Sequence, residues 1–394
     1  MFFARIGITK TIAMFVLIIT LIVLFLLPDL YISLALMRGA AWWAHLLLWL
    51  PTLVTFCLLL TFRHGISPVK MQAVIALLFC VAFPKIIFMA FSLLGKLPIG
   101  PRFSTIANGV GIVAGACVVL MAVYGVFFGW KTLSVRKVEL SFVDLPPAFD
   151  GYRIVQLSDL HVGTHGHNTA FVEKVVQRAN EEQADLMVFT GDLINLGPEE
   201  AVPFEQVLSR LKARDGVFSV LGNHDYCIHA MLGQRPDDIR KAVIPVIAAE
   251  KRLGWDVLLN EHRIIRHGTD SIALVGVENT GKPPFPEIGD LKGAMEGIPD
   301  GLFTLLLSHD PSHWRMEVIP KTHIPLTLSG HTHAMQFKIG HWSPSKWLYP
   351  EWGGLYTEGT QQLYVSEGLG GSIPFRLGTK PEIIVITLKK DLKP

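Results

Sequence analysis

The distribution of apolar residues divides the chain into two parts near residue 130. Before that point, four long stretches are almost wholly apolar, at about 11–27, 41–62, 71–94 and 106–129. Each is close to the length of roughly 20 residues that a helix needs to cross the hydrocarbon layer of a membrane. None of the four shows the polar face that a helix on the surface of a soluble protein presents. The pattern therefore predicts an N-terminal bundle of four transmembrane helices.

From about residue 135 the pattern changes to short β-rich runs that end in turn residues. Nine such runs begin at Val135, Tyr152, Asp185, Gly216, Ser271, Leu302, Leu326, Gln362 and Glu382. Helical patterns at about 168–183, 199–213 and 236–253 separate several of them. This order predicts an α/β sandwich, in which two mixed sheets pack together with helices outside. We assign residues 1–130 to a transmembrane domain, 131–150 to a linker and first strand, and 151–394 to the globular domain.

Composition and charge support the same division. The chain has 394 residues, of which 50% are hydrophobic and 17% charged, whereas a soluble domain carries about 25% charged residues. A wholly soluble enzyme and a disordered protein are both excluded. Residues 1–130 contain eight Lys or Arg but one acid, Asp29, whereas the remainder contains 27 Lys or Arg and 32 Asp or Glu. Since the second part is net acidic and has no basic patch with interleaved aromatics, we expect no nucleic-acid partner.

The basic residues beside the predicted helices indicate an orientation. With the N-terminus inside, seven flanking cations are cytoplasmic, namely Arg5, Lys10, Arg63, Lys70, Lys131, Arg136 and Lys137. Three, Arg38, Lys96 and Arg102, then lie outside. Because positive charge favours the cytoplasmic side, we expect the globular domain in the cytoplasm. Lys85 lies within the third span and is interpreted either as part of a functional site or as a side chain that snorkels or lines the bundle.

Residues with metal-binding side chains follow the predicted strands where each strand ends. They are Asp159 and His161, then Asp192, then Asn223, His224 and Asp225, then His309, and finally His331 and His333. In α/β folds, ligand sites lie at the carboxyl ends of strands, so we expect these residues to converge. Oxygen and imidazole ligands without thiolate suit Mn²⁺, Fe, Zn²⁺ or Mg²⁺. Their number predicts two metal ions that share a carboxylate, an arrangement that activates water and binds phosphoryl oxygens.

The order D-x-H, G-D, G-N-H-D, a later His and G-H-x-H resembles the calcineurin-like metallophosphoesterases over roughly residues 150–390. The segment from Val365 to Gly370, with Pro374, Arg376 and Pro381, is similar to the membrane-associated branch that includes the bacterial YkuE and YaeI proteins. The resemblance implies an αββα sandwich, a metal-dependent phosphoric ester hydrolase and a location in a bacterial inner membrane.

The resemblance also implies a role for each residue. The implied ligands of the first metal are Asp159, His161, Asp192 and His333. Those of the second are Asp192, Asn223, His309 and His331. His224 is implied as the acid that protonates the leaving group, with Asp225 orienting it. The implied cofactors are two divalent ions, Mn²⁺ first, with Fe, Zn²⁺ and Mg²⁺ as alternatives.

These residues predict a membrane-anchored enzyme that hydrolyses a phosphomonoester, phosphodiester or pyrophosphate bond of a small-molecule or lipid-linked substrate. One alternative is a pyrophosphatase of a nucleotide-linked lipid of the UDP-diacylglucosamine type. An alternative of another class is an inactive membrane sensor or scaffold. The aromatic-rich segment 341–352 is either a lip that guides an amphiphilic phosphate from the bilayer or a core beneath the ligand loops. The substrate, the metal pair and the oligomeric state stay open.

Overall fold

The computed structural model describes residues 20, 22–61, 68–227, 240–282, 285 and 287–391. The chain forms two compact units. The helical unit comprises Met1–Gly129 together with Ile373–Leu377, and the globular unit comprises Trp130–Ser372 together with Gly378–Pro394.

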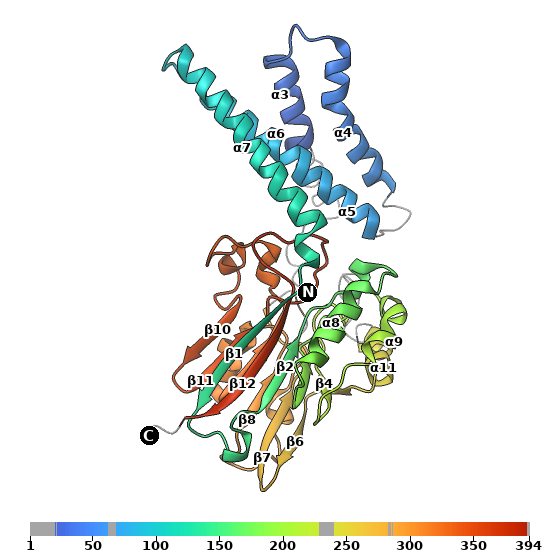
Figure 1. Ribbon diagram of the computed structural model, residues 1–394, viewed down its shortest axis with the longest axis vertical. Coiled ribbons are helices and arrows are strands. Elements are labelled where there is room, and N and C mark those ends of the chain that lie inside the picture. The colour runs from blue at the N-terminus through green and yellow to red at the C-terminus, as the bar shows by residue number, and fades with distance from the viewer. Residues whose placement is uncertain are drawn as a thin grey trace. The chain divides into compact units, whose positions relative to one another are not determined.

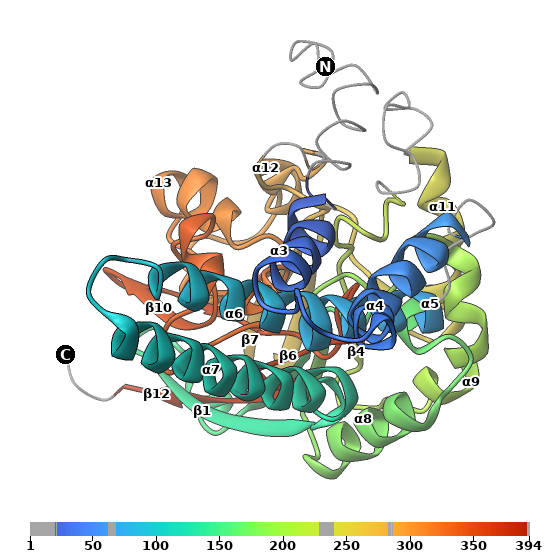
Figure 2. The ribbon, with the colours of Figure 1, turned by 90° about the horizontal axis from the view of Figure 1, so that it is seen from above.

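The helical unit contains apolar helices of different lengths (Figures 1 and 2). They are α3 (Leu27–Ala35), α4 (Trp42–Leu60), α5 (Pro68–Leu77), α6 (Phe83–Leu94) and α7 (Pro101–Phe127). A π-helical turn, Leu78–Ala82, joins α5 to α6. Within the described residues, three helical stretches are long and apolar enough to cross a membrane, namely Trp42–Leu60, Val69–Leu94 and Pro101–Lys131. They coincide with three of the predicted spans, whereas most of the first, 11–27, lies outside the described residues.

A buried ion pair connects three helices of this unit. The Nζ atom of Lys85 in α6 lies 2.5 Å from Oδ1 of Asp29 in α3. The hydroxyl of Thr52 in α4 donates to Oδ2 of Asp29 at 2.6 Å, and Lys85 also donates to the carbonyl of Leu48 at 2.8 Å. An ionisable side chain among apolar helices is stabilised by pairing with an opposite charge and with backbone carbonyls. Lys85 therefore lines the interior of the bundle.

A short segment from near the C-terminus, Ile373–Leu377, packs within the helical unit. The ring of Phe375 stacks on that of Phe79, with centroids 4.5 Å apart and planes 3° apart. The backbone N–H of Arg376 donates to the carbonyl of Gly125 at 3.2 Å. A side chain at position 125 would overlap the Phe375 ring, so the close approach requires glycine there. The chain thus contributes to the helical unit from both of its ends.

The globular unit contains two six-stranded sheets. In spatial order, the first consists of β1 (Ser134–Phe142), β12 (Glu382–Lys390), β2 (Arg153–Leu157), β3 (Leu186–Phe189), β4 (Val217–Ser219) and β5 (Asp256–Val257). The second consists of β10 (Gly354–Glu358), β11 (Gln361–Val365), β9 (Leu326–Ser329), β8 (Thr304–Leu307), β7 (Asp270–Gly276) and β6 (Glu261–His267). All nine predicted strands are present, whereas β5, β6 and β10 were not predicted.

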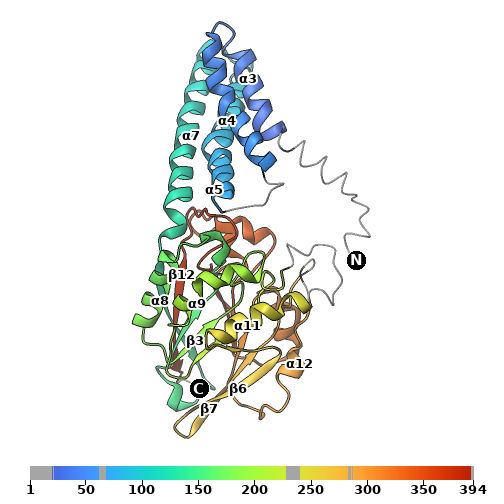
Figure 3. The same ribbon diagram turned by 90° about the vertical axis from the view of Figure 1, so that its right-hand side faces the viewer.

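The central strands of the first sheet, β2, β3 and β4, are buried on both faces. Ile154 of β2 belongs to the apolar cluster between the sheets, whereas its neighbour Val155 packs in the cluster beneath the outer helices. Those helices are α8 (Ala170–Glu181), α9 (Glu205–Leu208) and α11 (Ile244–Arg252) (Figure 3). On the second sheet, a separate cluster includes Trp314 and residues of α12 (Leu291–Ala294). Burial on both faces explains the continuous apolar runs, and the four layers confirm the predicted αββα sandwich.

The topology brings the strand ends together. Strands β2, β3 and β4 are parallel neighbours, and so are β8, β9 and β11. Parallel strands end at the same edge of a sheet, and polar loops follow these ends. The loops that contain the predicted site residues therefore begin next to one another, at the ends of these strands.

Candidate metal centre

The first group of predicted ligands meets in one buried cluster. Asp159, His161, Asp192 and His333 each offer a ligand atom, and these atoms all lie within 4.8 Å of one another. The Nε2 atoms of His161 and His333 are 3.2 Å apart. The Nε2 atom of His161 is 3.6 Å from Oδ2 of Asp192, and that of His333 is 3.5 Å from Oδ1 of Asp159.

The second group shares Asp192 with the first. Asp192, His309 and His331 again offer atoms within 4.8 Å of one another. The Nε2 atom of His309 lies 3.2 Å from Oδ2 of Asp192. The side-chain oxygen of Asn223 lies 3.2 Å from Nε2 of His309 and 2.8 Å from Nδ1 of His331. All seven predicted ligands are therefore brought together, with Asp192 between the two groups.

These separations are those of a coordination shell. Metal–ligand bonds of about 2.1 Å place neighbouring ligand atoms about 3.0–3.4 Å apart in octahedral or tetrahedral geometry. The two pairs of imidazole nitrogens, His161 with His333 and His309 with His331, are both 3.2 Å apart. Without thiolates, the carboxylate, imidazole and amide donors suit Mn²⁺, Fe, Zn²⁺ or Mg²⁺. The residues thus fit two metal ions.

Hydrogen bonds on the far side orient two of the imidazoles. The Nδ1 atom of His309 contacts the carbonyl of Thr190 at 2.8 Å, which directs Nε2 to the centre. The Nε2 atom of His331 contacts the hydroxyl of Tyr349 at 2.7 Å, which directs Nδ1 to the centre. Such partners fix the ring orientation and the tautomer of a metal-binding histidine.

The carboxylate of Asp225 holds the backbone around Asp192. It accepts hydrogen bonds from four backbone N–H groups, those of Asp192, Leu193, Ile194 and Gly222, at 2.8–3.3 Å. The ring of His224 instead contacts the carbonyl of Asn195 through Nδ1 at 2.8 Å. The backbone N–H of His224 donates to Oδ1 of Asp192 at 2.8 Å. Asp225 thus positions the shared carboxylate, and Asn195 positions the ring of His224.

Five of the seven predicted ligands have a left-handed backbone. Their φ angles are +53° for Asp159, +46° for His161, +59° for Asp192, +76° for His331 and +50° for His333. Non-glycine residues rarely adopt this conformation, and it costs roughly 1–3 kcal/mol at each site. Such strain persists only where the surroundings determine it and is concentrated at functional sites. The fold therefore directs these side chains inward at a cost in stability.

Two motif glycines leave room for the ligands. Gly191 has a φ of +93°, and a Cβ there would lie 2.7 Å from Nδ1 of His309. A Cβ at Gly330 would overlap the hydroxyl of Ser158 and the carboxylate of Asp159. Glycine at these positions lets the backbone approach the site closely.

Burial and mutual charge perturb the ionisation of the metal-free centre. Burial raises the pKa of Asp159 to about 7, although the charge of His309 opposes the rise. Burial alone would raise the pKa of Asp192, but the neighbouring imidazoles, chiefly His309, hold it well below its usual value. Burial alone would lower the pKa of His309, but the charge of Asp192 raises it to about 10. Burial lowers the pKa of His331 to about 4. At neutral pH the metal-free centre therefore contains a His309–Asp192 ion pair.

Sequence reasoning missed the residues that support the ligands. Gln156, Thr190 and Ser158 form a buried chain of hydrogen bonds that ends on Oδ2 of Asp159. Thr190 directly precedes the G-D motif and Ser158 directly precedes the D-x-H motif. Their position beside these motifs could have indicated a supporting role. Tyr349 lies 18 residues after its partner His331, and no motif marks it.

Both parts of the chain match known protein families. Residues 152–335 match the family described as calcineurin-like phosphoesterase. Residues 13–130 match the family described as probable calcineurin-like phosphoesterase, transmembrane domain. The metallophosphoesterase YkuE of Bacillus subtilis is 32% identical over 259 residues, which cover 62% of this chain and 82% of YkuE.

A further relative matches a larger share of the chain. A transmembrane protein with metallophosphoesterase domain from Danio rerio is 28% identical over 319 residues, covering 77% of this chain and 69% of that protein. The solved structure of a dimetal phosphatase from Danio rerio matches with a TM-score of 0.35 and 12% identity, covering 60% of this chain and 99% of that one. The chain belongs to the calcineurin-like phosphoesterases, as a member with a transmembrane domain.

Proposed function

We propose that this metal-dependent phosphoester hydrolase uses two divalent ions, bound by the seven converging ligands, to hydrolyse an amphiphilic phosphoester or pyrophosphate at a membrane. Asp159, His161, Asp192 and His333 would hold one ion, and Asn223, His309 and His331 would hold the other together with Asp192. The observation that supports this most strongly is the position of Asp192 in both groups. When bound, the ions would neutralise phosphoryl charge and activate water. Mn²⁺ is the ion that we propose first.

His224 is the proposed acid for the leaving group. Its ring packs edge-on against His161, with centroids 4.6 Å apart, and it is only half-buried. Because Nδ1 faces the Asn195 carbonyl, Nε2 is the atom that would donate a proton to the departing oxygen. A positioned acid of this kind contributes about 10²–10⁴-fold to a rate. An inactive scaffold would not need the complete set of ligands and the left-handed backbone that this centre retains.

The aromatic segment supports an amphiphilic substrate. Trp347 is 75% exposed and Trp342 is 38% exposed, and their rings pack edge-to-face at 5.5 Å. The neighbouring serines are buried, and Ser343 donates to the carbonyl of Ala334, next to His333, at 2.6 Å. Tyr349 of the same segment contacts His331. The segment therefore attaches to the ligand loop on one side and exposes tryptophans on the other, as a lip for an apolar chain would.

We also propose that the globular unit is cytoplasmic and that the membrane is a bacterial inner membrane. The support is the excess of cations on the predicted inner side of the helices, seven against three. The match of residues 13–130 to a transmembrane domain supports membrane integration.

Replacing Asp192 with Asn should remove activity and lower the metal content from two ions per chain to one or none, because one carboxylate serves both groups.

His224→Ala should lower turnover by about 10²–10³-fold and keep both ions. The loss in His224→Ala should be larger for an alkyl phosphate than for p-nitrophenyl phosphate, whose leaving group needs no proton. Elemental analysis and steady-state kinetics measure these effects. Loss of both ions in His224→Ala would show that His224 is a ligand.

Metal binding should release protons. At about pH 8.5 the metal-free protein keeps His309 protonated, because its pKa is raised to about 10, and that proton must leave before Nε2 binds an ion. We expect release of about one proton per chain and an affinity that rises with pH up to about pH 10. Calorimetry in buffers of different protonation enthalpy measures the release, and His309→Gln should abolish it. Binding of two ions without proton release would contradict the role of His309.

Replacing Trp342 and Trp347 with Ser should weaken hydrolysis of a lipid phosphate about tenfold or more and leave that of a soluble ester unchanged, because only the lipid uses the lip. Replacing both with Tyr should restore activity on the lipid, since tyrosine also favours the headgroup layer. Equal losses on both substrates, together with a lower melting temperature, would show that the tryptophans stabilise the fold instead.

A reporter fused after Pro394 should be cytoplasmic. A fluorescent protein at this position should fluoresce, and alkaline phosphatase should be inactive, because four crossings return the chain to the side of the N-terminus. Active alkaline phosphatase at this position would reverse the proposed orientation.

A further inference from the structure

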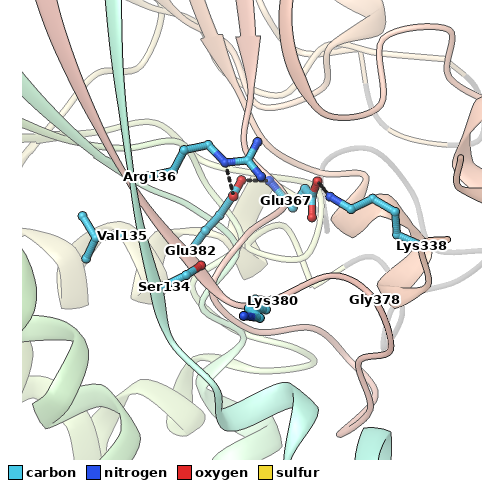
Figure 4. Close-up of a pocket in the computed structure, with 8 residues that line it drawn as sticks. All are labelled: Ser134, Val135, Arg136, Lys338, Glu367, Gly378, Lys380 and Glu382. Atoms are coloured by element: carbon cyan, nitrogen blue, oxygen red, sulfur yellow. Dashed lines mark hydrogen bonds and ion pairs between the residues drawn. The ribbon is translucent and has the colours of Figure 1, made fainter. Parts of the chain in front are cut away.

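A cavity of about 350 Å³ lies in the globular unit beside the first residues of β1 and β12. Three cations, Arg136, Lys338 and Lys380, and two carboxylates, Glu367 and Glu382, line it (Figure 4). None of these residues belongs to the two groups of metal ligands. The volume lies at the lower end of the range for small-molecule sites, about 300–1,000 Å³.

The two carboxylates are buried and already have partners. Oε1 of Glu382 accepts the backbone N–H of Glu367 at 2.7 Å, and Oε2 lies 3.4 Å from Nε of Arg136. Oε2 of Glu367 accepts the hydroxyl of Thr379 at 2.5 Å, and Oε1 pairs with Lys338. Each carboxylate thus receives contacts at both of its oxygens.

The cations are the more accessible charges. The side chain of Arg136 is 44% exposed and that of Lys338 is 16% exposed, whereas those of Glu382 and Glu367 are 3% and 4% exposed. A guanidinium has five N–H donors and an ammonium has three, so pairing with one carboxylate uses only part of the donor capacity of Arg136 or Lys338. A molecule that enters the cavity therefore meets N–H donors and an excess of positive charge. This chemistry favours an anion.

Two of the residues that line the cavity are close in sequence to the helical unit. Ser134, which lines it, follows Lys131, the end of the last apolar helical stretch, by three residues. Gly378, which also lines it, directly follows Leu377, the end of the segment that packs in the helical unit. Three extended residues span at most about 11 Å. Along the chain, these two lining residues are thus three residues from the last apolar helical stretch and one residue from a segment of the helical unit, and lipid headgroups lie at the ends of membrane spans.

We propose that this cavity binds the phosphate of an anionic phospholipid headgroup. Arg136, Lys338 and Lys380 would donate hydrogen bonds to the phosphate oxygens, as basic clusters beside membrane spans do for anionic lipids. Glu382 would hold the side chain of Arg136 in place, and Glu367 would hold that of Lys338. The site is separate from the hydrolytic reaction and takes a resident lipid rather than the substrate.

The site also adjoins the metal ligands through one loop. Gly368 directly follows Glu367, and a Cβ at Gly368 would lie 2.8 Å from Cβ of Asp159 and 3.1 Å from Nδ1 of His333. The same loop donates from Leu369 and Gly370 to the backbone carbonyls of Ser158 and Asp159, at 2.9 and 2.7 Å. Since Glu367 lines the cavity, a bound lipid would lie beside the residue that precedes this loop.

The test uses the full chain in nanodiscs of phosphatidylcholine with or without phosphatidylglycerol, followed by native mass spectrometry of the retained lipids. We expect preferential retention of phosphatidylglycerol, weakened about fivefold in Lys380→Gln and about 25-fold when Lys338→Gln is added. Lys292→Gln, at a cavity beside α12, is the matched control and should retain lipid like the wild type. Asp192→Asn should also retain it, because lipid binding does not require the reaction.

Two further arms complete the test. Lys338→Arg keeps the pair with Glu367 and should keep lipid binding, which separates loss of charge from misfolding of the Lys338→Gln variant. Glycerol 3-phosphate and inorganic phosphate should not displace the lipid at concentrations that leave the bilayer intact. Equal retention of phosphatidylglycerol in the wild type and Lys380→Gln, or binding of the soluble phosphates in place of the lipid, would overturn the proposal.

Discussion

The position of one buried carboxylate, that of Asp192, is the constraint on which the candidate site depends. Its Oδ2 atom lies near an imidazole of each group, that of His161 and that of His309, so neither group would be complete without it. Four backbone N–H groups bonded to Asp225 fix the turn that bears it. The left-handed backbone of Asp192 is stable only within this network, because isolated residues avoid that conformation. Local strain thus arranges the centre that we propose for hydrolysis.

Much of the globular fold follows from sequence pattern. Strands buried on both faces are continuous apolar runs, and all nine that were predicted are present. The three that were missed give little signal: β5 has two residues, and β6 (EHRIIRH) and β10 (GLYTE) each have few apolar positions. All three are edge strands. Only β5 pairs with a strand that is distant in the chain, whereas β6 and β10 pair with the strand that follows each of them.

The ligands of the candidate site were easier to predict from the sequence than the residues that hold them in place. The ligands stand in short motifs at strand ends, so their residue types and order were informative. The left-handed backbone, the contact of Tyr349 with His331 and the carbonyl of Asn195 beside His224 arise from tertiary packing. The same holds for Ile373–Leu377, whose apolar residues pack in the helical unit. Its sequence, IPFRL, does not by itself show which part of the chain its apolar residues pack against.

Electron paramagnetic resonance of the Mn²⁺-loaded full-length protein tests most directly whether two ions share Asp192. Two ions bridged by one carboxylate lie about 3.5–4 Å apart, and their electron spins couple at that distance. The shared carboxylate predicts two Mn²⁺ per chain and the multiline spectrum of a coupled pair. A simple six-line spectrum of isolated Mn²⁺, at one or two ions per chain, would contradict it.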